Sequence, residues 1–184
     1  SNVVNGAAFS NGSFYIASNA KAKSIIDKNV TENNVQFIAV DQKPTALSKI
    51  KKARIALWDM YGGSMPSGWT RLILEKFNYA FDVIYAKDVD TGNLRSKYDV
   101  IVFVGGAIPA VGSGVNTNAG FGFNNPNPDS IPVEYRNRLG RITAAKSIPQ
   151  LKLFMEAGGN IVTIGSSTQL AYHLKLPVAN AMVE

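Results

Sequence analysis

Three segments rich in glycine and serine contain the residues best suited to chemistry in this sequence. They are residues 59–69, 105–109 and 165–170, and each follows an apolar run. Glycines let backbone N–H groups approach an anion or an oxyanion closely, and serine hydroxyls bind ligands or act as nucleophiles. The candidate ligand-binding residues are Asp59, Gly62, Gly63, Ser64, Trp69, Gly105, Gly106, Ser166 and Ser167.

The first segment begins at Asp59 and contains Gly-Gly-Ser before an apolar helical pattern. Ser64 or Ser67 is suited to cap this helix, whose N-terminus favours anions. No Gly-Lys-Ser/Thr follows, so the segment is not a Walker loop. Asp59 and Ser64 would supply polar contacts to a ligand, whereas Trp69 is expected to pack in the core as the first apolar residue of the helix. The alternative is a tight strand-to-helix turn that binds nothing.

The other two segments suggest acyl chemistry, with weaker support. Gly-Gly directly after an apolar run, at residues 105–106, leaves backbone N–H groups free for an oxyanion, although glycines also simply end strands. Ser166 or Ser167 at a sharp strand-to-helix turn would need His173 as its base. The helix that follows should carry His173 about two turns away, so we favour a capping serine and an ordinary histidine. A serine hydrolase that uses Ser166 or Ser167 and a flavodoxin-like module that binds a small ligand or a flavin remain the alternatives.

The composition excludes several kinds of site. The chain of 184 residues has no cysteine and one histidine, which removes disulfides, thiolate metal sites and cysteine nucleophiles, and leaves too few ligands for a usual catalytic zinc. We therefore assign no catalytic residue, metal site or cofactor to the chain. No apolar run is long enough to span a membrane. The first residues contain no intact signal peptide and look like a tag scar, so we expect an excised or processed piece.

The net charge of +6 raises the possibility of nucleic-acid binding. The only dense basic run comprises Lys49, Lys51, Lys52 and Arg54, and the other basic residues are interleaved with acids. No aromatic RNA-binding pattern, zinc finger or basic zipper is present. We interpret the run as a solvated linker and expect no nucleic-acid partner.

The elements that must position the three segments form a strand–helix alternation. Strands are predicted at residues 54–59, 81–85, 99–104 and 160–165, and helical segments at 69–77, 94–98, 147–157 and 168–174. This order predicts an α/β fold with a three-layer parallel sheet of flavodoxin-like type, in residues 49–184, with ligands favoured at the carboxyl ends of the strands. Four strands are fewer than such sheets usually have, which raises the question whether the C-terminal part of the fold is missing.

Two further regions flank or interrupt this domain. Residues 1–48 are predicted to form a small strand–helix–strand annex and linker, with strands at 13–17 and 35–40 and a helix capped by Asn19. Residues 107–147 form a long segment rich in Gly, Asn and Pro, with Arg136, Arg138 and Arg141 assigned to a short helix. A segment of this length is usually functional, a packed cover or disordered.

At the three segments the sequence resembles the class I glutamine amidotransferase-like fold. In that family a Gly-Gly-Pro-type loop supplies the oxyanion hole, and residues 105–109 look like its counterpart. The family's Gly-x-Cys-x-Gly-x-Gln elbow is similar to residues 164–170, with Gly165 at the cysteine position if Gln169 is matched, or Ser166 after a shift by one. The thiolate is absent either way, as is the family's C-terminal His-x-Glu pair, so glutaminase chemistry is not carried over.

A closer resemblance covers most of the chain. Residues 54–75, 97–109 and 158–177 resemble a domain appended to bacterial secreted M14-family zinc carboxypeptidases. There the peptidase domain lies N-terminal and binds zinc through His-x-x-Glu and a distant His, with a Glu as general base, but His173 is followed by Leu-Lys-Leu. The resemblance implies that zinc and proteolysis belong to a parent protein, and that this chain is its non-catalytic accessory domain. It also implies a secreted or periplasmic location, with the peptidase domain and a cell-envelope ligand as partners.

Overall fold

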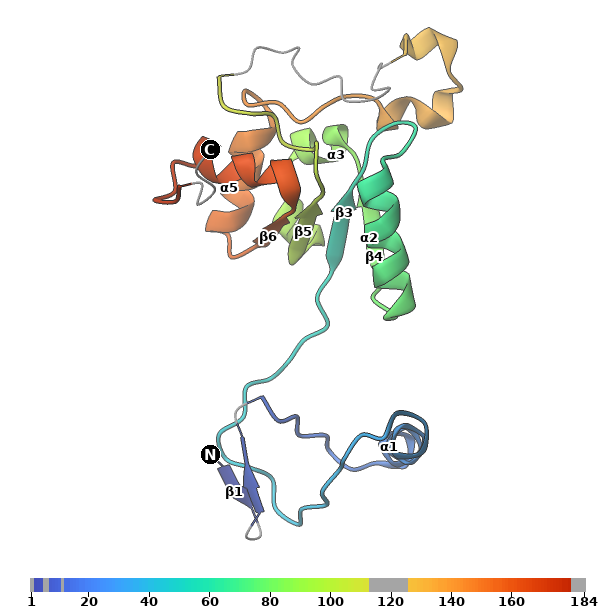
Figure 1. Cartoon of the computed structure of the whole chain (residues 1–184), viewed down its shortest axis with the longest axis vertical. Coiled ribbons are helices and arrows are strands. Elements are labelled where there is room, and N and C mark those ends of the chain that lie inside the picture. Colours follow the sequence, from blue (N-terminus) through green and yellow to red (C-terminus); the bar gives the residue numbers. More distant parts are fainter. Residues whose placement is uncertain (1, 5–6, 11, 113–125, 180–184) are drawn as a thin grey trace. The chain divides into compact units, whose positions relative to one another are not determined.

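The computed structural model in Figure 1 describes residues 2–4, 7–10, 12–112 and 126–179. Its backbone contacts divide the chain into two compact units, Ser1–Lys51 and Lys52–Glu184. The boundary lies just after the predicted end of the annex at residue 48. Within the long segment predicted at residues 107–147, residues 113–125 lie outside the described residues.

The first unit contains a hairpin and a helix. Strand β1 (Asn2–Val4) pairs antiparallel with β2 (Ala7–Phe9), and helix α1 spans Ala20–Asn33. The predicted N-cap is confirmed, because the Asn19 side chain accepts a hydrogen bond of 2.8 Å from the Ala22 N–H. The helix ends at Asn34, which adopts the left-handed conformation with φ 49°.

The predicted strand–helix–strand arrangement of this unit is wrong. Residues 13–17 and 35–40 form no strand, and most of their side chains are exposed. An apolar run becomes a strand only where a neighbour accepts its backbone hydrogen bonds and covers its apolar side chains. Neither run has such a neighbour among the described residues. The pairing instead involves two segments that flank Asn5-Gly6, a dipeptide typical of hairpins.

The second unit is built on a parallel sheet, and the predicted α/β class is confirmed. Strands β3 (Ile55–Trp58), β4 (Phe81–Ile84), β5 (Val100–Phe103) and β6 (Asn160–Thr163) lie in the order β4-β3-β5-β6. Every neighbouring pair is parallel. All four strands lie within the segments predicted for them. Because parallel strands end at one edge, the loops that follow β3, β5 and β6 share that edge of the sheet (Figure 1).

Helices connect the strands. The α-helices are α2 (Met65–Lys76), α3 (Ala86–Thr91), α4 (Leu94–Lys97), α5 (Ser147–Glu156) and α6 (Leu170–His173). The 3₁₀ helices are η1 (Pro128–Ser130), η2 (Val133–Arg138) and η3 (Gly165–Gln169). Helix α5 packs against α3 and α4, while α2 contacts β3. Of the three arginines assigned to a short helix, Arg136 and Arg138 lie on η2, whereas Arg141 lies beyond it.

The core lies around the two central strands, β3 and β5, and side chains on β6 are less buried. Leu57, Val102 and Val162 are in register on β3, β5 and β6, and therefore on one face of the sheet. Their exposed fractions rise from 0% to 9% and 46% in that order. Asp59 continues the alternation of Leu57 and contacts α2, so this is the face that α2 covers. The covering on this face is thus complete over β3 and partial over β6.

An ion-pair network ties the opposite edge of the sheet together. The Asp99 carboxylate, just before β5, accepts hydrogen bonds from the Arg54 side chain at 2.9 and 3.0 Å and from its backbone N–H at 2.9 Å. Arg95 Nη1 donates a further bond of 2.5 Å. The Arg54 side chain is the largest cause that holds the pKa of Asp99 well below its ordinary value. Asp99 in turn raises the pKa of Arg54.

Candidate functional site

The loop after β3 is organised around the buried carboxylate of Asp59. One carboxylate oxygen accepts hydrogen bonds from the Met60 N–H at 2.9 Å and the Ser64 N–H at 3.0 Å. The other oxygen forms an ion pair with Arg71 on α2. Asp59 is only 3% exposed, and its carboxylate, which was expected to contact a ligand, is occupied by these internal partners. Asp59 fixes the loop onto the first turns of α2.

Ser64 is the N-cap of α2, as one of the two predicted possibilities. Its Oγ accepts a hydrogen bond of 3.2 Å from the Ser67 N–H. Gly62 and Gly63 precede it with φ of 82° and 77°, which L side chains rarely adopt. These glycines are exposed and make the turn. The segment therefore has the geometry of a capped strand-to-helix turn.

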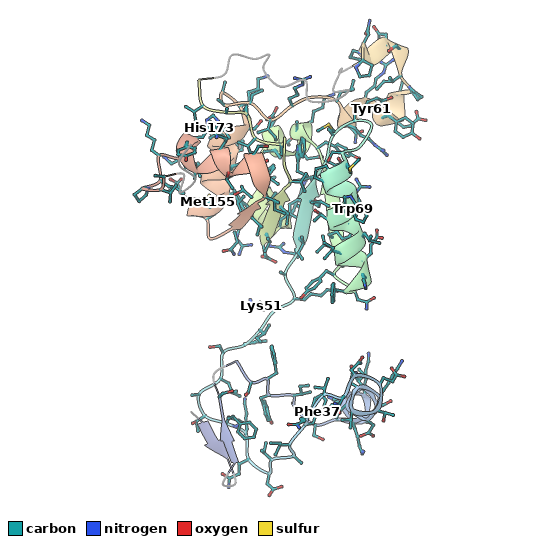
Figure 2. All side chains as sticks on the ribbon, viewed as in Figure 1. Phe37, Lys51, Tyr61, Trp69, Met155 and His173 are labelled. Carbon is teal, nitrogen blue, oxygen red and sulfur yellow. The ribbon has the colours of Figure 1, made fainter. Side chains whose placement is uncertain are left out.

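The expectation that Trp69 packs in the core is wrong. Its side chain is 62% exposed on α2, where Figure 2 labels it. The residues of α2 that face the sheet are Ser67, Arg71 and Leu74, three or four positions apart. Arg71 was not anticipated as the partner of Asp59. The sequence carried no signal for this pairing, because the apolar spacing on α2 favours the opposite face of the helix as the inward one.

The second and third segments meet through serine hydroxyls. Ser166 Oγ accepts a hydrogen bond of 2.8 Å from the Gly106 N–H. Ser167 Oγ accepts bonds of 3.1 Å from Ala107 N–H and 3.2 Å from Ile108 N–H, and donates its own proton to the Val104 carbonyl. The three N–H groups that follow Gly105 are therefore each paired with a hydroxyl of the elbow.

The backbones of the two loops also approach each other closely. Gly165 has φ 59°, and a Cβ atom built there would lie 3.7 Å from the Cα of Gly105. Gly106 has φ 86°, a conformation that glycine adopts without strain. The glycines at 105, 106 and 165 thus serve a loop-to-loop contact, in which Ser166 and Ser167 provide the hydrogen bonds.

His173 faces a backbone carbonyl and not a serine. Its Nε2 lies 2.8 Å from the carbonyl oxygen of Pro109. A carbonyl oxygen only accepts, so Nε2 carries the proton and donates it in this contact. Ser167 is fully buried, whereas Ser166 is exposed. Figure 2 labels His173 at the end of the second unit that holds these loops.

The structure thus separates the nine candidates into two groups of four and one isolated residue, Trp69. Gly105, Gly106, Ser166 and Ser167 lie together in one hydrogen-bonded loop pair. Asp59, Gly62, Gly63 and Ser64 form the turn before α2, and Trp69 lies on the outer side of that helix. In the part of the chain that the structure describes, no three His, Asp or Glu side chains gather as a metal site would require. No helix among those residues has the length and apolarity to cross a membrane.

Comparison of the chain with protein-family models, curated proteins and solved structures finds no match.

Proposed function

We propose that this chain is a non-catalytic domain of the class I glutamine amidotransferase-like type, with a flavodoxin-like three-layer architecture. The strand order β4-β3-β5-β6 supports this fold, because numbering the strands along the chain from β3 gives 2-1-3-4, the order at the start of flavodoxin-like sheets. We further propose, from the sequence resemblance, that it is an accessory domain of a secreted or periplasmic M14-type zinc carboxypeptidase. Its role there is structural.

The observation that supports the non-catalytic part of this proposal is that the hydroxyls of Ser166 and Ser167 both form hydrogen bonds within the protein. An oxyanion hole needs backbone N–H groups that are free to receive a developing negative charge. Here the N–H groups of Gly106, Ala107 and Ile108 already bond to Ser166 or Ser167. In an acyl-transfer enzyme, Ser166 or Ser167 would be the nucleophile and these N–H groups would be the oxyanion donors. Here the same hydroxyls and N–H groups are hydrogen-bonded to each other.

The histidine geometry supports the same conclusion. A serine nucleophile needs a base whose ring nitrogen accepts its proton. His173 uses Nε2 as a donor to Pro109, and the hydroxyl proton of Ser167 goes to the Val104 carbonyl. Neither group is arranged for proton transfer to the other. Zinc and the peptidase residues would belong to the parent protein.

A fluorophosphonate probe tests the catalytic part of the proposal. We expect no labelling of the purified chain, with a known serine hydrolase in the same reaction to show that the probe is active. Labelling that is lost in Ser166→Ala or Ser167→Ala would establish the serine hydrolase instead. The visible absorbance of the purified chain tests the flavin-binding alternative, and we expect no flavin band.

The coding sequence upstream of this chain tests the proposed context. We expect it to encode, in the same reading frame, a peptidase domain with His-x-x-Glu and a later His. A frame that encodes no such domain would contradict the accessory role. A thermal-shift screen with peptidoglycan fragments separates a structural role from a ligand-binding one, since only binding raises the melting temperature.

A further inference from the structure

Helix α2 carries its apolar stripe on the side that faces away from its own sheet. Ser67, Arg71 and Leu74 point inward, and Arg71 pairs with Asp59. A helix that covers a sheet normally has the opposite arrangement, with large apolar residues inward and polar residues outward. The outward residues are between 52% and 78% exposed, and they are Met65, Trp69, Leu72, Ile73 and Phe77.

These outward residues form one continuous ridge. Met65, Trp69, Ile73 and Phe77 follow one another at intervals of four, and Leu72 lies beside them. Residues four apart form the ridge that fits the groove of another helix in the commonest class of helix packing, with a crossing angle of about −50°. A contiguous apolar patch of this kind on a water-soluble surface marks an interaction site.

We propose that this ridge is the interface of a homodimer, in which α2 of one copy packs against α2 of a second copy about a two-fold axis. A single ridge suffices for both partners in such a contact, because a two-fold interface uses the same patch twice. The proposal is independent of the accessory role proposed above. It concerns only the surface of the second unit.

The area of the ridge is consistent with a second copy as its occupant. An aromatic side chain carries roughly 150–250 Å² of surface and an aliphatic one somewhat less, so complete burial of the exposed parts of all five on both copies would remove at most about 1,200 Å² from water. That is at the lower limit of specific protein interfaces, which begin at about 1,200 Å². The dimer would therefore be moderately stable and would dissociate on dilution.

The charges on α2 fit the same arrangement. Lys76, near the C-terminal end, is the only charged residue among the outward positions of the ridge. The methylene stem of Lys76 can lie along the ridge while its ammonium group reaches water at the rim of the contact. Each chain carries a net charge of +6, and added salt screens the repulsion between copies. Association should therefore strengthen with salt, unlike an interface held by ion pairs.

Sedimentation of the purified full chain over a range of concentrations is the direct test. We expect a mass of twice 19.8 kDa at high concentration and a monomer on dilution. Tryptophan emission should shift to longer wavelength on dilution, because Trp69 leaves the interface while Trp58 stays buried in the core. A chain that sediments as a monomer at every concentration, with constant emission, would overturn the proposal.

Matched variants locate the interface. Leu72→Glu should weaken association roughly thirty-fold or more, the effect of losing an interface hot spot. Leu153→Glu is the control, because Leu153 is a similarly exposed leucine on α5, 57% against 52% for Leu72. Unchanged circular dichroism and melting of both variants would show that they fold. Equal weakening by both, or a Leu72→Glu chain that remains a dimer, would contradict the assignment to α2.

Discussion

Ser167 shows how a single hydroxyl can be removed from chemistry by the groups around it. It is fully buried, accepts from two backbone N–H groups and donates to one carbonyl. Ser166 makes a single bond of this kind, to Gly106, and is exposed. The two neighbouring serines therefore differ in how much stability they contribute, although nothing in the sequence distinguishes them.

Replacing each serine by alanine separates their contributions. Ser167→Ala leaves the Ile108 N–H without its partner in the protein interior and should lower the free energy of unfolding by about 1–3 kcal/mol. Ser166→Ala, at an exposed position, should cost about 0.5–1 kcal/mol, because water replaces the lost hydroxyl. Urea unfolding of both variants measures the difference. Equal losses would mean that Ser167 is not the principal contact between the loops.

The candidate site was predictable as a set of loops but not as a set of contacts. Ser64 was one of two N-cap candidates, with Ser67, since both serines precede an apolar helical pattern, and the structure selects Ser64. The pairing of Asp59 with Arg71 depends on which face of α2 meets the sheet, and the sequence does not specify that face. The hydrogen bond from the Gly106 N–H to Ser166 Oγ joins residues 60 positions apart, so only the folded sheet brings them together.

At the level of elements, the parallel sheet followed from the sequence and the small N-terminal unit did not. The strands β3 and β5 are almost continuous β-branched or apolar runs, a pattern specific to strands covered on both faces. The short apolar runs at residues 13–17 and 35–40 carry the same local preference, but local preference does not supply a pairing partner. Helix α3 was missed because Ala86–Thr91 is short and polar, with only Ala86 and Val89 buried.

Asp99, which joins the starts of β3 and β5 through its arginines, makes the pairing of these elements dependent on pH. Its pKa is lowered in the folded chain, chiefly by Arg54, so it stabilises the fold fully above its ordinary pKa of about 3.9 and loses this effect as pH falls below that value. Asp99→Asn should therefore lower the melting temperature at pH 7, and the difference from the parent chain should shrink below about pH 4.

Asp129→Asn is a suitable control for this experiment. Asp129 pairs with Arg136 at 3.5 Å, but its side chain is largely exposed, and exposed pairs contribute little. Its melting curves should follow the parent chain at every pH. A difference between Asp99→Asn and the parent that persists unchanged at pH 2 would mean that Asp99 acts through shape and not through charge.

At the scale of the whole molecule, the two units differ in how many of their side chains are buried. The second unit holds all the buried side chains of the described chain, whereas residues 9–10 and 12–51 include none. The folding free energy of a domain comes mainly from apolar burial, so the second unit should account for the cooperative unfolding transition. Residues 49–54, the lysine-rich segment at the boundary of the two units, are all exposed.

Limited digestion with trypsin tests this difference. Cleavage should occur first after Lys49, Lys51 or Lys52, which are exposed and outside any helix or strand. The remaining fragment, identified by its mass, should melt within a degree or two of the intact chain, because it retains the whole core. A fragment that melts markedly lower would show that the first unit stabilises the second.

The loop at residues 105–108, whose N–H groups bond to Ser166 and Ser167, has a consequence for the rate at which backbone amide protons exchange with solvent. Glycine loops at a sheet edge usually belong to the regions whose amide protons exchange with solvent first. Here the amides of Gly106, Ala107 and Ile108 are held by side chains that come from beyond β6. Exchange at the buried amides of Ala107 and Ile108 requires the two loops to separate, so it should be governed by the opening of the sheet itself. A loop that looks adaptable from its glycines would then be among the slowest parts of the molecule to exchange.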